Sequence, residues 1–193
     1  KSMNVKDMLR QASDAAKQLI TLSDQTIIGI LKETAQVLRT HTEEVLAANR
    51  QDLERMDPAN PKYDRLKLTE ERLQGIAADM ENVSTLPSPL NKVLSETIRP
   101  NGMVIRKVTV PFGVIGVIYE ARPNVTFDVF SLCFRSGNVC VLKGGSDADF
   151  SNRALVRIIH SVLERQGINP AVCTLLPPDR EATAELLGAV GLV

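Results

Sequence analysis

The sequence has few of the residues that most often carry chemistry or bind charged polymers. Among its 193 residues there are no tryptophans, 3 cysteines and 2 histidines, and 23 basic side chains are balanced by 23 acidic ones. The lack of a basic surplus disfavours nucleic acid as a partner. No run of about 18 apolar residues predicts a membrane span, and the first residues lack the pattern of a signal peptide. These absences predict a cytoplasmic globular protein with no nucleic-acid or membrane partner.

The scarce thiols and imidazoles form no metal-binding or catalytic pattern. Cys133, Cys140 and Cys173 lie inside apolar helix or strand patterns without metal-type spacing, so we expect them to be reduced and structural. None has a candidate activating base nearby in the sequence, which argues against a nucleophilic role. His41 and His160 lack a Cys, Asp or Glu at ligand spacing, and solvated or capping roles are therefore expected.

Residues 110–152 predict a strand, a helix and a second strand. The run 113–119 is apolar on both faces, as strands are when helices cover both sides of a parallel sheet. The second strand is predicted at 139–142. Between the strands, Gly137 stands where a helix should end. The residues predicted to form the buried face of this helix are Val125, Val129, Leu132 and Cys133.

The residues before this unit predict helices and then a hairpin. Helices are expected to begin after Asn4, at Ser23 or Asp24, and after Thr69, all of which are good N-cap residues. We expect these helices to pack on the sheet, with a separate partner-binding bundle as the alternative. A capping box of Thr40 and Glu43 predicts a helix restart, and residues 57–67 a loop. The runs 95–99 and 103–110 predict antiparallel strands joined through Asn101-Gly102, because both residues tolerate positive φ.

The residues after the unit continue the alternation of helix and strand. Ser151 is predicted to cap a helix that stops at Gly167, and residues 171–176 predict a third strand. Asp179 is expected to cap a helix through Leu187. Residues 191–193 resemble the start of a fourth strand, which predicts a parallel sheet that continues beyond this sequence.

The candidate site residues follow the two buried strands, because ligands bind beyond the carboxyl ends of strands in open parallel sheets. After the second strand comes Lys143-Gly144-Gly145-Ser146, whose cation, glycines and hydroxyl suit a ribose or phosphate group. A tight strand exit is the alternative, since neither a dinucleotide fingerprint nor a phosphate loop occurs. After the first strand, Arg122 suits an acyl phosphate or carboxylate, with Glu120 as a possible ion-pair partner. Asn124 suits the N-cap of the following helix.

The same residues resemble a known family. Four short motifs occur in the order and at the spacing seen in the cofactor-binding half of gamma-glutamyl phosphate reductases, which belong to the aldehyde dehydrogenase superfamily. They are YEARPN, SGN, LKGGS and SNR. The resemblance implies an α/β, Rossmann-like parallel sheet with N-terminal helices and an antiparallel hairpin. It divides residues 1–193 into a helical lead-in (1–90), a hairpin (91–110) and a parallel α/β part (111–193). It also implies a catalytic domain downstream that is absent from this sequence.

The resemblance further implies an activity, the NADPH-dependent reduction of L-glutamyl 5-phosphate to L-glutamate 5-semialdehyde and phosphate in proline biosynthesis. A cysteine thiolate of the downstream domain would form a thioester that accepts hydride, so this sequence alone is expected to be inactive. An aldehyde-oxidising relative, or a non-catalytic nucleotide-binding or assembly module, are the alternatives.

Residue roles follow from the resemblance as well. It places the oxyanion-donating amide at Asn124, or a substrate-binding group at Arg122, and the cofactor at Lys143, Gly144, Gly145 and Ser146. NAD-preferring relatives often carry a glutamate three residues after this lysine, whereas here the residue is Ser146, which favours NADPH. In the family a comparable hairpin reaches a neighbouring subunit, which implies a homo-oligomer.

Overall fold

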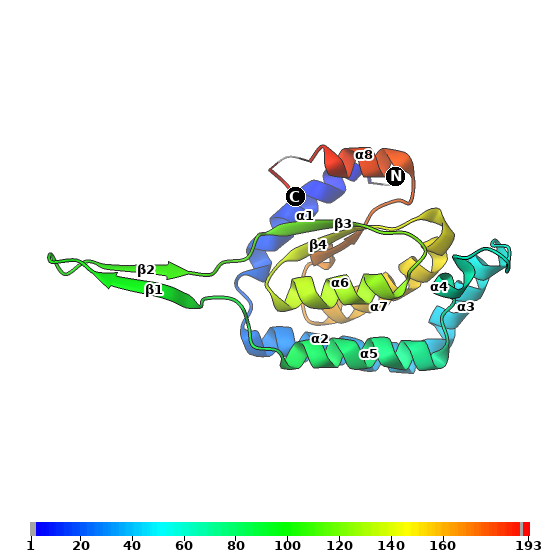
Figure 1. Cartoon of the computed structure of the whole chain (residues 1–193), viewed down its shortest axis with the longest axis horizontal. Coiled ribbons are helices and arrows are strands. Elements are labelled where there is room, and N and C mark those ends of the chain that lie inside the picture. Colours follow the sequence, from blue (N-terminus) through cyan, green and yellow to red (C-terminus); the bar gives the residue numbers. More distant parts are fainter. Residues whose placement is uncertain (1–2, 190) are drawn as a thin grey trace.

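The computed structural model describes residues 3–189 and 191–193. Helices come first along the chain, a hairpin follows, and strands then alternate with helices (Figure 1). In chain order they are α1 (Val5–Leu19), α2 (Asp24–Thr40), α3 (Thr42–Glu54), α4 (Tyr63–Leu66), α5 (Glu70–Thr85), β1 (Val93–Ile98), β2 (Val104–Val108), β3 (Val114–Ile118), α6 (Asn124–Arg135), β4 (Val139–Lys143), η1 (Ser146–Ala148), α7 (Asp149–Arg165), η2 (Pro170–Val172), β5 (Cys173–Leu175) and α8 (Arg180–Leu187).

The body of the molecule is built around a parallel sheet of order β3-β4-β5. The middle strand β4 is buried at every residue, as its continuous apolar run predicts. β3 differs from the prediction, because Gly116 and Ile118 are exposed rather than covered on both faces. The reason is its position: β3 pairs with β4 alone within the described residues and is therefore an edge strand.

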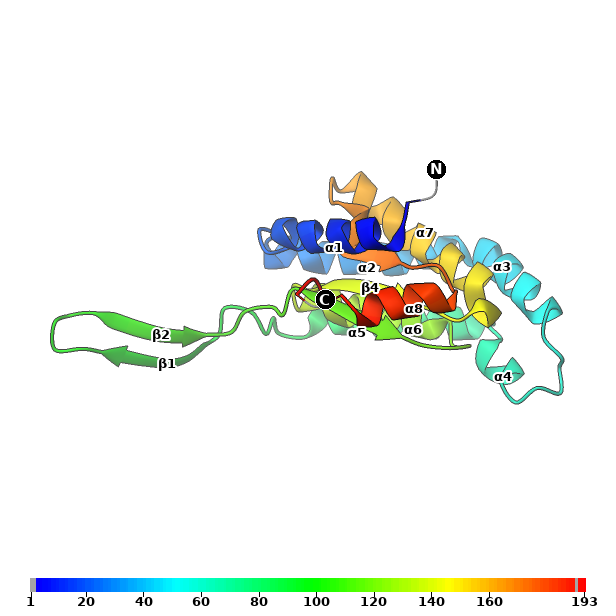
Figure 2. The same cartoon turned by 90° about the horizontal axis from the view of Figure 1, so that it is seen from above.

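Helices cover both faces of the sheet and form further layers (Figures 1 and 2). α1 lies on one face with α8 beside it, and α6 and α7 lie on the other. α2 and α5 pack against each other and cover α6 and α7 from outside. Side chains of α1, α2, α5, α6, α7 and the strands share one hydrophobic core. The prediction that the first helices pack on the sheet is thus confirmed for α1, whereas α2 and α5 pack on the helices that cover the sheet.

Most predicted helix ends are confirmed by hydrogen bonds. The side chains of Asn4, Ser23, Thr69 and Asp179 each accept a backbone N–H of the first turn of α1, α2, α5 and α8. Gly137 and Gly167 follow α6 and α7 with positive φ, a conformation that glycine adopts at little cost.

Two predicted caps and two predicted segments are wrong. Thr40 and Glu43 form no capping box, since Thr40 Oγ1 donates to the carbonyl of Val37 and α3 begins without a side-chain cap. Ser151 lies within α7, where its hydroxyl donates to Asp52 of α3 instead of capping its own helix. The segment 57–67 contains α4. Residues 191–192 form a turn, so no fourth strand begins there.

Of the predicted buried face of α6, Cys133 is buried and Val125 and Val129 are partly buried, but Leu132 is not. Three aromatic side chains, Phe127, Phe130 and Phe134, are fully buried, whereas Leu132 is 56% exposed. The rings of Phe130 and Phe134 stack with centroids 5.1 Å apart. Large aromatic side chains bury more apolar area than the aliphatic residues of the predicted face, so the face of the helix that carries them is turned to the core.

The hairpin β1–β2 extends from the body (Figures 1 and 2). Its strands are antiparallel, and the backbone N–H of Arg99 donates to the carbonyl of Met103 at 2.8 Å across the turn. Of the turn residues Asn101 and Gly102, only Gly102 adopts positive φ. Every residue of both strands is exposed, so the hairpin contributes nothing to the core of this chain.

Candidate functional site

A cavity of about 480 Å³ lies at the carboxyl ends of β4 and β5, and we call it the strand-end pocket. It contains Gly145 and Ser146 of the loop after β4, as the sequence predicts, together with residues from segments far away in the chain. Its lining residues are Lys62, Glu120, Gly145, Ser146, Asp147, Pro178, Asp179 and Arg180. The position is the one where open parallel sheets bind ligands.

Lys143 and Gly144, the other two predicted residues of this loop, are not in the lining of the pocket. The ammonium of Lys143, a buried residue, donates to the carbonyl oxygens of Gly144 at 2.8 Å and Pro178 at 3.1 Å. It thereby ties the loop after β4 to the loop after β5. A Cβ at Gly144 would lie 2.3 Å from Nδ2 of buried Asn152. Gly144 is therefore required by the protein's own packing, and not only by a ligand.

A buried carboxylate braces the loop that carries Ser146. Asp52 of α3 accepts hydrogen bonds from the backbone N–H of Phe150 (3.2 Å) and of Ser151 (2.7 Å), and from the Ser151 hydroxyl (2.6 Å). The same carboxylate pairs with Arg55 at 2.7 Å. Arg55 in turn donates to the carbonyl of Ser146 at 3.1 Å, and its guanidinium lies 4.7 Å from the centre of the Phe150 ring. The carboxylate thus caps α7 from another helix.

The loop after β3 lines two different pockets. Glu120 faces the strand-end pocket, where it pairs with Lys62 at 3.0 Å, a contact that raises the pKa of that lysine. The predicted pair of Glu120 with Arg122 is therefore wrong. Arg122 and Asn124 instead line a second cavity of about 390 Å³, the cationic pocket, between this loop and the segment 64–79.

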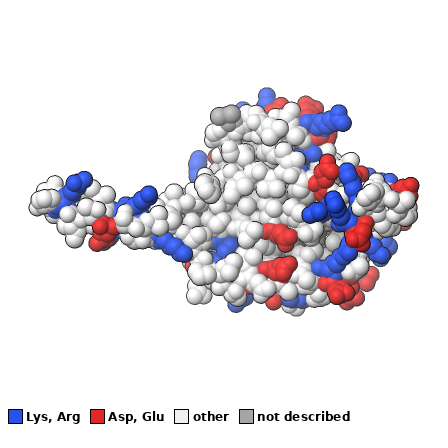
Figure 3. Space-filling model, viewed as in Figure 1, with Lys and Arg blue, Asp and Glu red and all other residues white. Residues whose placement is uncertain are grey.

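The cationic pocket carries more positive than negative side chains. Its full lining is Asp64, Arg65, Lys67, Leu68, Arg72, Gly75, Ile76, Asp79, Arg122 and Asn124. Sequence reasoning found only Arg122 and Asn124, because the other residues come from α4, α5 and their connection, more than 40 positions earlier. Figure 3 shows charged side chains gathered at the end of this face where α3 and α4 lie.

Asn124 is the first residue of α6 and does not cap it, so the predicted cap is wrong. Its Nδ2 lies 3.4 Å from Oδ2 of Asp128, one turn further along the helix. Burial of the Asp128 carboxyl raises its pKa above the ordinary value, while the Asn124 contact opposes this. The amide of Asn124 is thus oriented from within α6 at the mouth of the cationic pocket.

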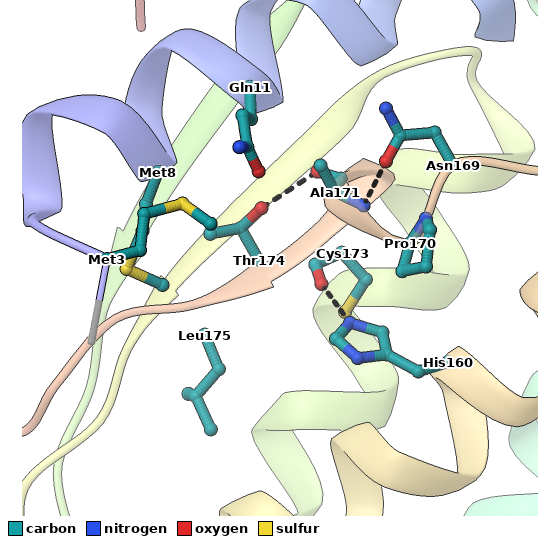
Figure 4. Close-up of a pocket in the computed structure, with 10 residues that line it drawn as sticks. All are labelled: Met3, Met8, Gln11, His160, Asn169, Pro170, Ala171, Cys173, Thr174 and Leu175. Carbon is teal, nitrogen blue, oxygen red and sulfur yellow. Dashed lines mark hydrogen bonds between the residues drawn. The ribbon is translucent and has the colours of Figure 1, made fainter. Parts of the chain in front are cut away.

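A third cavity, of about 290 Å³, lies between α1, α7 and the edge of β5 (Figure 4). Several of its polar groups are already engaged within the protein. His160 Nε2 lies 2.6 Å from the carbonyl oxygen of Cys173, and Thr174 Oγ1 donates to the carbonyl of Ala171 at 2.8 Å. Because the imidazole contacts the carbonyl of Cys173 and that residue is buried, the two do not form a catalytic dyad.

The three cysteines are buried and unbridged, as predicted. Burial raises the pKa of Cys133 to about 12, and a hydrogen bond from Cys140 to Cys173 together with burial raises the pKa of Cys140 well above its ordinary value. Thiols in such surroundings are poor nucleophiles. Among the described residues no group of three His, Cys, Asp or Glu side chains is arranged for a metal, and no helix is long and apolar enough to cross a membrane.

The fold defines the class of protein, which is an α/β unit of the aldehyde dehydrogenase type. An acetylating aldehyde dehydrogenase from Geobacillus thermoglucosidasius superposes on 98% of this chain with a TM-score of 0.73 at 17% identity. Closer in structure is a gamma-glutamyl phosphate reductase from Thermotoga maritima, with a TM-score of 0.91 and 31% identity over 96% of this chain and 46% of that one. No family model matches the chain.

Sequence comparison finds relatives of higher identity. A gamma-glutamyl phosphate reductase from Azobacteroides pseudotrichonymphae is 64% identical over 98% of this chain, and one from Bacteroides thetaiotaomicron is 64% identical over 93%. Over nearly its whole length the chain is similar to gamma-glutamyl phosphate reductases. It spans about half the length of the curated relatives it matches, 45% and 43% of these two.

Proposed function

We propose that this chain is the cofactor-binding part of an enzyme that reduces L-glutamyl 5-phosphate to L-glutamate 5-semialdehyde with NADPH, in the cytoplasm. The 64% identity to reductases of that name is the observation that carries the proposal. The cysteine nucleophile is expected in a domain downstream of this sequence, since the three buried thiols here do not suit the role.

The strand-end pocket suits a phosphorylated nucleotide. Ser146 and Arg180 bring a hydroxyl and a guanidinium to its lining, which are donors that sugar hydroxyls and phosphates accept, and Lys62, which is paired with Glu120, adds an ammonium. Gly145 leaves its backbone open, because a Cβ there would only reach ordinary contact at 3.7 Å. NADPH would supply the hydride. Lys143, whose ammonium is engaged by two carbonyls, acts in this proposal by fixing the loop.

Selectivity for NADPH is assigned to Ser146, which is exposed and uncharged. Ser146→Glu should flatten or reverse the preference for NADPH over NADH, because a carboxylate repels a 2′-phosphate. Asp14→Glu, on the exposed face of α1, is the control for an altered acidic side chain. Equal discrimination by the Ser146→Glu enzyme and the wild type would show that this loop does not read the 2′-phosphate.

Asn124 and Arg122 act on the substrate in this proposal. The amide of Asn124 would donate to the acyl oxygen as negative charge develops on it, and Arg122 would bind the phosphoryl group. Removing one oxyanion donor typically costs about two to three orders of magnitude in turnover. We expect that loss for Asn124→Ala in the complete enzyme, with an unchanged KM for cofactor. Asn82→Ala, on the exposed side of α5, should be neutral. Normal turnover of the Asn124 variant would contradict the assignment.

We further propose that the hairpin β1–β2 joins copies of the complete protein. Its exposed apolar side chains include Leu94 and Ile98, which are 59% and 69% exposed. An isolated two-stranded hairpin is only marginally stable in water, so a partner surface is expected to cover it. Ile98→Asp should lower the oligomeric state in light scattering. Ile20→Asp, at a position 63% exposed on the body, should not. An unchanged mass for both variants would refute the proposal.

A further inference from the structure

The cationic pocket has a surplus of positive charge that the protein does not neutralise. It is lined by four cationic side chains and two carboxylates, a surplus of two positive charges. Asp64 is paired with Arg72 at 3.3 Å. Within the described part of the chain, the side chains of Arg65, Lys67 and Arg122 form no ion pair or hydrogen bond, and neither does that of Asp79. An anionic ligand that also carries one cationic group would match this set.

The segment that presents Lys67 and Arg65 is fixed from two sides. Buried Asn49 donates to the carbonyl of Leu66 and accepts the backbone N–H of Leu68, both at 2.9 Å. Arg72 donates to the carbonyls of Asp64 and Lys67, at 2.7 Å and 2.6 Å. The backbone on either side of Lys67 is thus held in place while its ammonium remains unpaired. Such an arrangement lowers the cost of ordering a binding loop.

A glycine of α5 also belongs to the lining of the cationic pocket. Gly75 lies in the interior of α5, where glycine is less favourable than alanine. A Cβ at this position would have nothing within 4 Å, so neither packing nor backbone conformation requires the glycine. It lines the cationic pocket. The missing side chain therefore keeps space open in the pocket, which is the property a ligand needs.

We propose that the cationic pocket recognises the α-amino-acid end of the substrate, with Lys67 and Arg65 on its carboxylate and Asp79 on its ammonium. This inference rests on the proposed function. L-Glutamyl 5-phosphate, with a phosphoryl group, a carboxylate and an ammonium, has a net charge of about −2 at neutral pH, which balances the surplus of the pocket. Arg122 and Asn124 stand at the same pocket for the phosphoryl and acyl groups. The volume of about 390 Å³ is in the range of small-molecule sites.

The assignment of Asp79 is tested by comparing two substrates of the complete enzyme in the oxidative direction. Glutarate semialdehyde has the carboxylate of glutamate 5-semialdehyde but lacks its ammonium. Asp79→Asn should lower kcat/KM for glutamate 5-semialdehyde about 10- to 100-fold and change that for glutarate semialdehyde less than about 3-fold. Equal losses for both substrates, or no loss, would overturn the assignment, because a structural role affects both alike.

Lys67 and Gly75 are tested with matched controls. Lys67→Gln should lower kcat/KM about 10- to 100-fold for both semialdehydes, whereas Lys32→Gln, at an exposed lysine of α2, should be neutral. Gly75→Gln should raise the thermal midpoint and also raise the KM for semialdehyde at least about 10-fold. Gly29→Gln alters the comparable exposed glycine of α2 and should raise only the midpoint. An unchanged KM in Gly75→Gln would contradict an open pocket at this position.

Direct binding separates this inference from the proposed function. L-Glutamate carries the same amino-acid end, and we expect calorimetry to detect its binding to the complete protein and at least a 10-fold weakening in Lys67→Gln and Asp79→Asn. A protein without reductase activity that binds L-glutamate through these residues would refute the proposed function alone. An active reductase whose variants bind L-glutamate as the wild type does would refute the pocket assignment alone.

Discussion

Replacing Asp52 by alanine should release the first turn of α7 and, with it, the loop of Ser146. The carboxylate is buried and accepts hydrogen bonds from three groups of Phe150 and Ser151 at 2.6 to 3.2 Å. Hydrogen bonds to charged groups contribute about 1.5 to 3 kcal/mol each, and removing one partner of a buried pair costs about 3 to 5 kcal/mol. Arg55 is half exposed and stays hydrated when Asp52 is removed. We therefore expect the loss of stability to lie at the low end of this range, at about 3 kcal/mol.

Hydrogen exchange measures this loss locally. A decrease of about 3 kcal/mol in local opening free energy accelerates amide exchange about 150-fold, and it should be concentrated in peptides covering 146–155. Asp14→Ala is the matched control, because Asp14 also forms an i,i+3 ion pair but is 72% exposed. Its effect should stay within about 0.5 kcal/mol. Exchange at 146–155 that is unchanged by Asp52→Ala, or accelerated equally across the chain, would refute the role of Asp52 as a cap.

Two substitutions and one labelling experiment test other parts of the structure. Gly144→Ala should destabilise the fold by about 1 to 3 kcal/mol in denaturant unfolding, because its Cβ meets Asn152 Nδ2 at 2.3 Å; a neutral result would show that Asn152 can move. Asp128→Asn should stabilise the fold at pH 7 and have little effect below about pH 3, because a carboxyl whose pKa is raised by burial destabilises the fold only when it is ionised; stabilisation that is equal at both pH values would contradict this. The three buried thiols of Cys133, Cys140 and Cys173 should resist alkylation at pH 7 until the protein unfolds; rapid labelling of the folded protein would refute their burial.

Local patterns predicted most of the secondary structure, because the signals are local. β4 is a short apolar run bounded by Gly137 and a polar loop, and helix starts at Asn4, Ser23 and Thr69 follow from side chains that reach their own first turn. The capping of α7 escaped prediction because its acceptor, Asp52, lies 99 residues from Ser151 in the sequence. A contact between residues so far apart in the sequence leaves no trace in the local pattern of apolar and polar residues.

The candidate site was predictable in part for the same reason. The rule that ligands bind beyond parallel strands located Arg122, Asn124, Gly145 and Ser146. It did not reveal that the first two line one pocket and the last two another. Nor did it find the residues that α4, α5 and the loop after β5 contribute, since charged residues on exposed segments have no pattern that distinguishes a pocket from a solvated face.

The central claim is tested most directly by assaying the complete protein with glutamate 5-semialdehyde, phosphate and NADP, and monitoring NADPH at 340 nm. The account predicts NADPH formation that requires phosphate, that is at least about 10-fold slower with NAD, and that falls by about two orders of magnitude in Asn124→Ala. Oxidation of the semialdehyde that proceeds equally well without phosphate would identify an aldehyde-oxidising relative and contradict the account.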